Sequence, residues 1–212
     1  MTHVAIIDCG AGNLHSVRKA IASQLPAGAT LEVTTDVVAL DGATHIVLPG
    51  VGAFADCMNG LNALTGMRAA LEKKVLHGTT PFLGICVGMQ MLFERGHEHG
   101  SHEGLGWFKG EVREITPADA TLKIPHMGWN RLRLKQKDHP FFAGIKDDDF
   151  AYFVHSFAAQ NVNPLEVSAM VDYGGEVVAA IARKHIVATQ FHPEKSQAVG
   201  LAMLRNFLNM GS

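Results

Sequence analysis

Cys86 lies in a sequence that suits a reactive cysteine. Residues 81–85 are mostly apolar, residues 84–88 read Gly-Ile-Cys-Val-Gly, and from Met89 the apolar side chains follow a helical spacing. This order predicts a strand, a sharp turn at Cys86 and a helix, with glycines that leave room for a strained backbone. Helix N-terminal amides favour the reactive thiolate. A buried structural cysteine is an equally good explanation of this pattern alone.

His192 and Glu194 form a candidate base and its orienting group. A cysteine that attacks an amide needs a base that takes its proton and later protonates the leaving nitrogen, and that base must be oriented. In an extended segment, positions two residues apart point to the same side, so Glu194 can reach the ring of His192. His-Pro-Glu alone is usually an exposed turn. Together with the turn at Cys86, it predicts a Cys86–His192–Glu194 triad that only folding can assemble.

The elements that must position these residues alternate in the first half of the chain. Strands are expected at residues 4–7, 31–34, 45–48 and 81–85, with helices at residues 14–25, 53–64, 67–76 and from 89 onward. Such alternation predicts an α/β fold with a mainly parallel central sheet flanked by helices, and ligands at the carboxyl ends of its strands. The Gly-x-Gly-Asn of residues 10–13 lacks the third glycine of a dinucleotide-binding loop, so a tight turn is expected there.

The second half of the chain has a different pattern. From Trp107 onward, short apolar runs are separated by turns such as residues 173–176, which predicts antiparallel strands. The expected strands cover residues 108–115, 131–134, 150–157, 166–171, 177–182 and 185–190. An amphipathic helix with Val199, Met203 and Phe207 on its buried side ends the chain.

Composition limits the classes of function. The 212 residues suit one domain over residues 1–212, and 18 Lys and Arg against 20 Asp and Glu imply neither nucleic acid nor an anionic membrane as partner. Three cysteines, at positions 9, 57 and 86, have no metal-site spacing and no disulfide framework, and free thiols fit a cytoplasmic protein. Neither a signal peptide nor a membrane-spanning segment is expected.

Residues 95–104 contain three histidines and two glutamates, which invites a metal-site interpretation. Four of these ten residues are glycine or serine, and no flanking pattern would hold a coordination geometry. A solvated loop without metal is therefore predicted.

Taken together, these motifs resemble the signatures of class I (triad) glutamine amidotransferases. Residues 84–90 and 191–194 are similar to the signatures of the class, and residues 7–13 and 48–54 extend the resemblance over nearly the whole chain. The Pro-His-Met-Gly-Trp-Asn of residues 125–130 and the Lys-Ser after Glu194 are similar to members that work with a cyclase of histidine biosynthesis. Cys9 departs from the pattern, because the family has a tyrosine there.

The resemblance implies further site residues. The glycine-rich turn after residue 48 would supply oxyanion-hole amides, since acyl transfer needs donors at the developing oxyanion. An ordinary strand-to-helix turn is the alternative interpretation. The expected oxyanion-hole residues are Gly50, Val51, Gly52 and Val87. The expected substrate-binding residues are Gln90, Glu98, His155, Ser156 and Phe157. The expected partner interface is Trp129, Asn130, Tyr152 and Lys195.

The resemblance also implies an activity and a partner. It predicts hydrolysis of L-glutamine to glutamate and ammonia through a cysteine thioester, without a cofactor, and delivery of ammonia to a (β/α)8-barrel cyclase in a heterodimer. Two alternatives stay open: a stand-alone cysteine hydrolase of γ-glutamyl bonds, and a non-catalytic regulatory subunit. Gln90 follows Cys86 by one helical turn, which would place it on the cysteine's side of the helix.

Overall fold

An eight-stranded sheet forms the centre of the molecule in the computed structural model, which describes residues 1–10 and 12–211. In spatial order its strands are β2 (Thr30–Thr34), β1 (His3–Ile7), β3 (His45–Gly50), β4 (Phe82–Cys86), β14 (Ile186–Thr189), β13 (Glu176–Arg183), β12 (Val167–Asp172) and β9 (Arg133–Leu134). The strands from β2 to β14 are parallel, and β13, β12 and β9 continue the sheet in antiparallel pairs. The predicted α/β fold class is thus confirmed.

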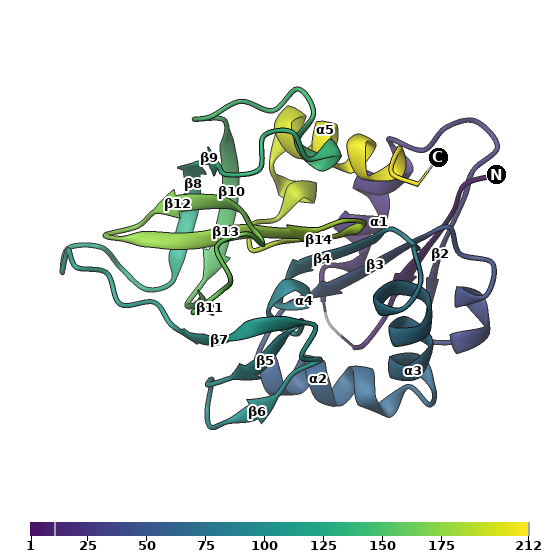
Figure 1. The fold of residues 1–212 in the computed structure, drawn as a ribbon, viewed down its shortest axis with the longest axis horizontal. Coiled ribbons are helices and arrows are strands. Elements are labelled where there is room, and N and C mark those ends of the chain that lie inside the picture. The colour runs from purple at the N-terminus through teal and green to yellow at the C-terminus, as the bar shows by residue number, and fades with distance from the viewer. Residues whose placement is uncertain (11, 212) are drawn as a thin grey trace.

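Helices cover both faces of the parallel half of this sheet (Figure 1). On one face lie α1 (Leu14–Ala22) and α5 (Gln197–Leu208), and on the other lie α2 (Phe54–Ala63), α3 (Met67–Leu71) and the short α4 (Val87–Gln90). Helix α3 continues into a π-helical turn, η2 (Glu72–Leu76). The described residues also form the 3-10 turns η1 (Val37–Leu40), η3 (Pro140–Phe142) and η4 (Pro193–Lys195).

Two smaller sheets lie beside the central one. β8 (His126–Arg131) pairs with β10 (Phe150–His155) in an antiparallel ribbon. The other sheet has the order β11 (Phe157–Gln160), β7 (Phe108–Glu114), β5 (Phe93–Gly96) and β6 (His102–Glu103). These two sheets build up the region beyond the carboxyl end of β4, where the predicted site lies (Figure 1).

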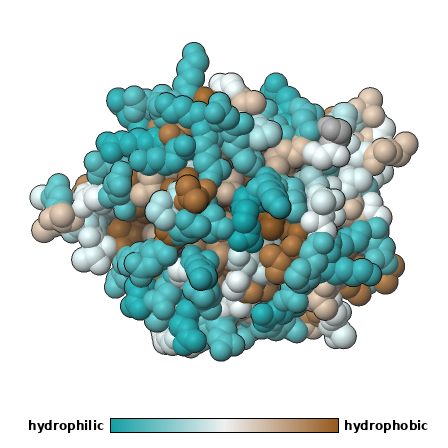
Figure 2. Space-filling view, in the orientation of Figure 1, coloured by the Kyte–Doolittle hydropathy of each residue, from teal (hydrophilic) through white to brown (hydrophobic). Residues whose placement is uncertain are grey.

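The middle strands of the central sheet are buried on both faces. Every residue of β3, β4 and β14 is buried, which explains why their sequences read as continuous apolar runs. By contrast, the face shown in Figure 2 is largely hydrophilic, with apolar side chains in small separate groups. Within the described residues, no helix has the length and apolar character needed to cross a membrane.

The chain after α4 departs from the prediction. A helix was expected from Met89 through Phe93, but α4 ends at Gln90 and β5 begins at Phe93. The carbonyl oxygens of Met91 and Leu92 accept hydrogen bonds from the amides of residues 105, 107 and 108. Tertiary pairing therefore replaces the helical hydrogen bonds that the apolar spacing predicted.

Three further boundaries differ from the predicted elements. Part of the expected loop at residues 95–104 forms β6 and the end of β5. The strand expected at residues 131–134 is β9 alone, and the preceding motif of residues 126–131 is the strand β8. The strand expected at residues 150–157 divides into β10 and β11 at Ser156.

Glycines allow the elements around Cys86 to pack closely. A Cβ atom on Gly88 would lie 1.9 Å from the Leu48 carbonyl oxygen, and one on Gly84 would lie 2.8 Å from the Gly88 oxygen. A Cβ atom on Gly50 would lie 2.7 Å from the Gly88 nitrogen. The backbones of β3, β4 and α4 thus touch where Cys86 is held.

We expect Gly88→Ala to lower the free energy of unfolding by about 3 kcal/mol or more, because the added methyl group must push β3 and α4 apart. Gly42→Ala is the matched control, since Gly42 is exposed and has no heavy atom within 4 Å of a built Cβ. That control should change stability by less than about 1 kcal/mol. Urea denaturation of both variants measures the difference, and equal stabilities would contradict the close packing.

Candidate active site

Cys86 occupies a strained backbone position between β4 and α4. Its φ of 56° and ψ of −113° lie in a region that non-glycine residues rarely adopt. Such strain costs on the order of 1–3 kcal/mol and persists only where the surrounding structure enforces it. Here the glycine contacts between β3, β4 and α4 enforce it. The turn places the Cys86 side chain at a cavity, although the residue is only 4% exposed.

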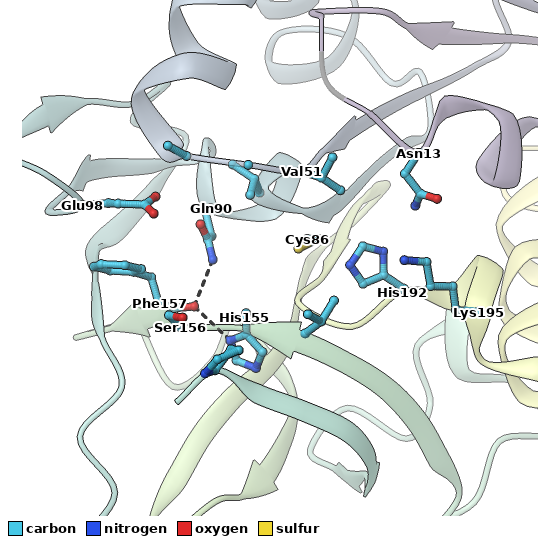
Figure 3. A pocket seen from close by; sticks show the side chains of 15 residues that line it. Asn13, Val51, Cys86, Gln90, Glu98, His155, Ser156, Phe157, His192 and Lys195 are labelled. Atoms are coloured by element: carbon cyan, nitrogen blue, oxygen red, sulfur yellow. Dashed lines mark hydrogen bonds between the residues drawn. The ribbon is translucent and has the colours of Figure 1, made fainter. Parts of the chain in front are cut away.

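His192 reaches this cavity from the end of β14. Its backbone N–H donates to the Tyr152 carbonyl at 2.9 Å, which joins the segment to β10. The Ser196 hydroxyl donates to the His192 carbonyl at 2.7 Å and accepts from the Tyr152 N–H at 3.0 Å. These three bonds fix the histidine, and Figure 3 shows its ring beside Cys86.

Glu194 holds the far side of the His192 ring. Its Oε1 lies 2.7 Å from His192 Nδ1, and the glutamate side chain is 0% exposed. Because a carboxylate only accepts, Nδ1 carries the proton and Nε2 is left toward Cys86. The predicted pairing of His192 and Glu194 is made, but not in an extended segment. The 3-10 turn η4 brings the carboxylate back to the ring.

The groups around the His192 ring favour its protonated form. Burial lowers the pKa of His192, but hydrogen bonding to Cys86 and Glu194 and their negative charges outweigh burial and raise it to about 9. His192 Nε2 makes no hydrogen bond of ordinary length to a described residue. Catalytic hydrogen bonds are often long until substrate binds. The site can therefore stabilise a negative sulfur and supply a proton to a leaving group.

A cavity of about 630 Å³ opens at Cys86, a volume that suits a small polar ligand. The five expected substrate-binding residues all line it, as do Val51, Gly52 and Val87 of the expected oxyanion hole (Figure 3). Gly50, the remaining expected oxyanion-hole residue, is the last residue of β3 and lies in register with Cys86. The Glu98 carboxylate also accepts from the Phe54 N–H at 2.8 Å, so it stabilises the start of α2.

The expected interface residues divide into two groups. The Trp129 ring is packed edge-on against Tyr152 with 5.8 Å between ring centroids, and Lys195 Nζ lies 6.0 Å from the Tyr152 centroid. Trp129 is 45% exposed, and Lys195 also lines the cavity. Asn130 differs, because its amide nitrogen donates to the Asp172 carbonyl and to His126 within the protein.

Asn13 is a site residue that the sequence interpretation missed. Its amide donates to Glu194 Oε1 at 2.5 Å, so it orients the carboxylate that orients His192. Asn13 has a left-handed φ of 73° and makes no side-chain cap on α1, which frees its amide for this contact. It belongs to the predicted tight turn at residues 10–13, in which Ala11 lies outside the described residues. Its place after the first parallel strand was the available signal.

Gln190 was also missed. It is fully buried, and its amide nitrogen lies 3.8 Å from Cys86 Sγ. Its Oε1 accepts from Gln90 Nε2 at 2.9 Å. Gln190 thus joins the cysteine to a predicted substrate-binding residue. No sequence signal distinguished it from an ordinary strand-end residue.

The other two cysteines brace the turn after β3. The Cys9 thiol donates to the Pro49 carbonyl at 3.8 Å, and the Cys57 thiol donates to the Val51 carbonyl at 3.5 Å. The adjacent Cys9 side chain, and to a lesser extent burial, raise the pKa of the Cys57 thiol. Cys57 therefore stays a neutral thiol. In the part of the chain that the structure describes, no cysteine is in a disulfide, and no three His, Cys, Asp or Glu side chains form a metal site.

Comparisons with known proteins agree with this geometry. The family model of class-I glutamine amidotransferases matches residues 5–210. The imidazole glycerol phosphate synthase subunit HisH of Brucella suis is 52% identical over 211 residues, covering 97% of each chain. The subunit of the same name from Rhodospirillum rubrum is 50% identical over 208 residues, again covering 97% of each chain. This chain therefore belongs to the class-I glutamine amidotransferase family.

Solved structures support the fold. A crystal structure of a glutamine amidotransferase superposes with a TM-score of 0.74 at 17% identity, covering 98% of this chain and 97% of that one. A crystal structure from Thermoplasma acidophilum, named as a GMP synthase protein, gives a TM-score of 0.66 at 20% identity, covering 99% of this chain and 94% of that one. At these identities the likeness concerns the fold alone.

The raised pKa of His192 predicts a pH-dependent stability. The folded pKa of about 9 lies above the ordinary 6.5, so folding takes up a proton between these values. The stability from this group is complete below about pH 6.5 and is lost as the pH rises through about 9. We expect NMR titration of the His192 ring, assigned with His192→Asn, to give a pKa well above 6.5 that falls in Glu194→Gln. A wild-type value at or below 6.5 would contradict the electrostatic account.

Proposed function

We propose that this protein is the glutaminase subunit of imidazole glycerol phosphate synthase, which hydrolyses L-glutamine and delivers ammonia to a cyclase subunit. One observation carries the proposal: the Cys86 thiol, the His192 ring and the buried Glu194 carboxylate form one group at a cavity. The choice of this particular synthase is supported by the names of relatives that are about 50% identical over nearly the whole chain.

In the proposed reaction, His192 takes the proton of the Cys86 thiol, and the sulfur attacks the side-chain amide carbon of glutamine. The amides of Val87 and of the segment from Gly50 to Gly52 stabilise the oxyanion of the tetrahedral intermediate. His192 protonates the amide nitrogen, the C–N bond breaks, and ammonia leaves a γ-glutamyl thioester. Water then gives a proton to His192 and attacks the thioester carbon, the C–S bond breaks to release glutamate, and His192 returns the proton to the Cys86 sulfur. Glu194 keeps the His192 tautomer throughout.

The cavity supplies contacts for the rest of glutamine. Gln90 and Glu98 offer oxygen acceptors on one side, and the β10–β11 segment with His155, Ser156 and Phe157 lies on the other (Figure 3). We propose that acceptors bind the nitrogen groups of glutamine and that the β10–β11 segment binds its α-carboxylate. No cofactor enters any step.

The proposed partner is a (β/α)8-barrel cyclase that forms a heterodimer with this chain. Trp129, Tyr152 and Lys195 form the candidate contact surface, because they are adjacent to one another and Lys195 reaches the cavity. A partner docked there would receive ammonia close to where it forms. The whole chain would act as one domain in this complex, in the cytoplasm.

Cys86→Ala separates the two halves of the proposed reaction. We expect it to abolish glutamine hydrolysis, because no other described group near His192 can form the thioester. Synthesis from added ammonia by the complex with the cyclase should persist. Assays of both activities on the reconstituted complex test this, and loss of both would refute the division of labour.

Trp129→Ala tests the contact surface. An exposed tryptophan at an interface often contributes strongly to binding, so we expect the Kd for the cyclase to rise about tenfold or more. Leu165→Ala is the matched control, since Leu165 is an exposed apolar residue at 85% exposure outside the proposed surface. Calorimetric titration with the cyclase measures both variants. Loss of stability without loss of binding would indicate that Trp129 is a packing residue.

Two alternative functions predict different activities. A stand-alone γ-glutamyl hydrolase would hydrolyse glutamine at full rate without the cyclase, whereas a non-catalytic subunit would not hydrolyse it at all. Glutaminase assays with and without the cyclase and its nucleotide distinguish them. Activity that rises when both are present supports the proposal.

A further inference from the structure

A chain of hydrogen bonds runs through the protein beside the cavity. The Asn130 amide nitrogen lies 3.2 Å from His126 Nε2, and His126 Nδ1 lies 3.0 Å from His155 Nε2. His155 Nδ1 lies 2.9 Å from the Phe157 carbonyl oxygen, which also accepts from Gln90 Nε2 at 3.0 Å. Figure 3 shows the last two bonds meeting at this carbonyl oxygen.

At the Asn130 end of this series of hydrogen bonds, the contacts fix the position of the His126 proton. The Asn130 amide nitrogen also donates to the Asp172 carbonyl at 2.9 Å, and its oxygen accepts from the Arg131 N–H at 2.8 Å. Backbone groups therefore define which amide atom is which. Because the amide nitrogen only donates, His126 Nε2 accepts, and its proton is on Nδ1. That proton is donated to His155 Nε2.

At the Phe157 end of the series, the backbone carbonyl independently requires that His126 donates to His155. The Phe157 carbonyl can only accept, so His155 Nδ1 carries a proton and His155 Nε2 accepts from His126. Both rings are then neutral. Burial lowers the pKa of His126 to about 4 and that of His155 to about 3. Neither ring takes up a second proton near neutral pH.

The series of hydrogen bonds continues through the side-chain amides of Gln90 and Gln190 to Cys86. Gln90 Nε2 donates one hydrogen to the Phe157 carbonyl and the other to Gln190 Oε1, at 3.0 and 2.9 Å. Gln190 Nε2 then faces Cys86 Sγ at 3.8 Å. Both Gln90 hydrogens are committed to the protein, and its oxygen is left facing the cavity (Figure 3).

We propose that Asn130, His126 and His155 are positioning residues that fix the Gln90 amide with its oxygen toward the ligand. This inference rests on the proposed glutaminase function. A fixed oxygen acceptor attracts ligand groups that donate hydrogen, such as the amide or ammonium nitrogen of glutamine. It repels a carboxylate, so it helps the site to bind glutamine and to release glutamate.

Loss of the His126 donor has a specific consequence. His155 Nε2 then has no donor facing it, so only the bond from Nδ1 to the Phe157 oxygen holds the His155 ring in place. A His155 ring that is free to turn no longer fixes the Phe157 carbonyl, and the Gln90 amide that donates to the same oxygen loses its fixed arrangement. Gln90 can then rotate and present its NH2 group to a carboxylate.

A matched pair of variants at His126 tests this proposal. The His126 ring is stacked between Phe153 and Tyr173, with centroids 4.8 and 4.0 Å away. His126→Phe keeps the stacking and removes the donor, whereas His126→Asn loses the stacking and keeps an N–H donor near the position of Nδ1. Thermal denaturation of both variants checks that they fold.

Glutaminase assays are made on the complex with the cyclase and its nucleotide. For His126→Phe we expect the KM for glutamine to rise about tenfold, the size of one hydrogen bond, with little change in kcat. Inhibition by glutamate should strengthen by a similar factor. His126→Asn should restore both values toward wild type. If the ring acts only by packing, the Asn variant is the more impaired one.

A second background separates this inference from a general loss of structure. His155→Asn removes the ring that His126 holds and keeps an amide donor for the Phe157 carbonyl, so adding His126→Phe should leave KM and glutamate inhibition unchanged there. The proposal would be overturned if the two substitutions had additive effects in the double variant. It would also be overturned if His126→Phe alone left KM and glutamate inhibition unchanged. Those outcomes leave the glutaminase function intact. A wild-type complex that does not hydrolyse glutamine would overturn both.

Discussion

The strained backbone of Cys86 is the constraint on which the site depends. The residue adopts φ 56° because β3, β4 and α4 approach so closely that glycines must stand at Gly50, Gly84 and Gly88. The same packing that buries the strand core therefore directs the sulfur toward the cavity. Moving Cys86 to an ordinary strand conformation would require these elements to separate, so the stability of the fold and the placement of the thiol are one property.

The histidine side of the site is fixed by a second layer of contacts. Glu194 orients His192, and Asn13 in turn orients Glu194, so residues from both ends of the chain meet at the end of the sheet. Both the carboxylate and the imidazole are buried. Burial lowers the pKa of His192, but hydrogen bonding to Cys86 and then to Glu194 outweighs burial and raises that pKa to about 9.

Much of this arrangement could be predicted from the sequence. Local patterns were sufficient for the parallel strands, the turn at Cys86 and the pairing of His192 with Glu194, because each depends on neighbouring residues. The early end of α4 could not be predicted, since it results from pairing with residues 105–108. The roles of Asn13 and Gln190 were not predicted for the same reason, because their partners Glu194 and Cys86 are 181 and 104 residues away in the sequence.

The most direct test of the account is covalent labelling with a diazo-ketone analogue of glutamine, followed by mass spectrometry of the intact and digested protein. The account predicts a single adduct, located on Cys86, that forms far more slowly in His192→Asn and is absent in Cys86→Ala. Labelling of Cys9 or Cys57 instead, or a rate at Cys86 that is unchanged without His192, would contradict it.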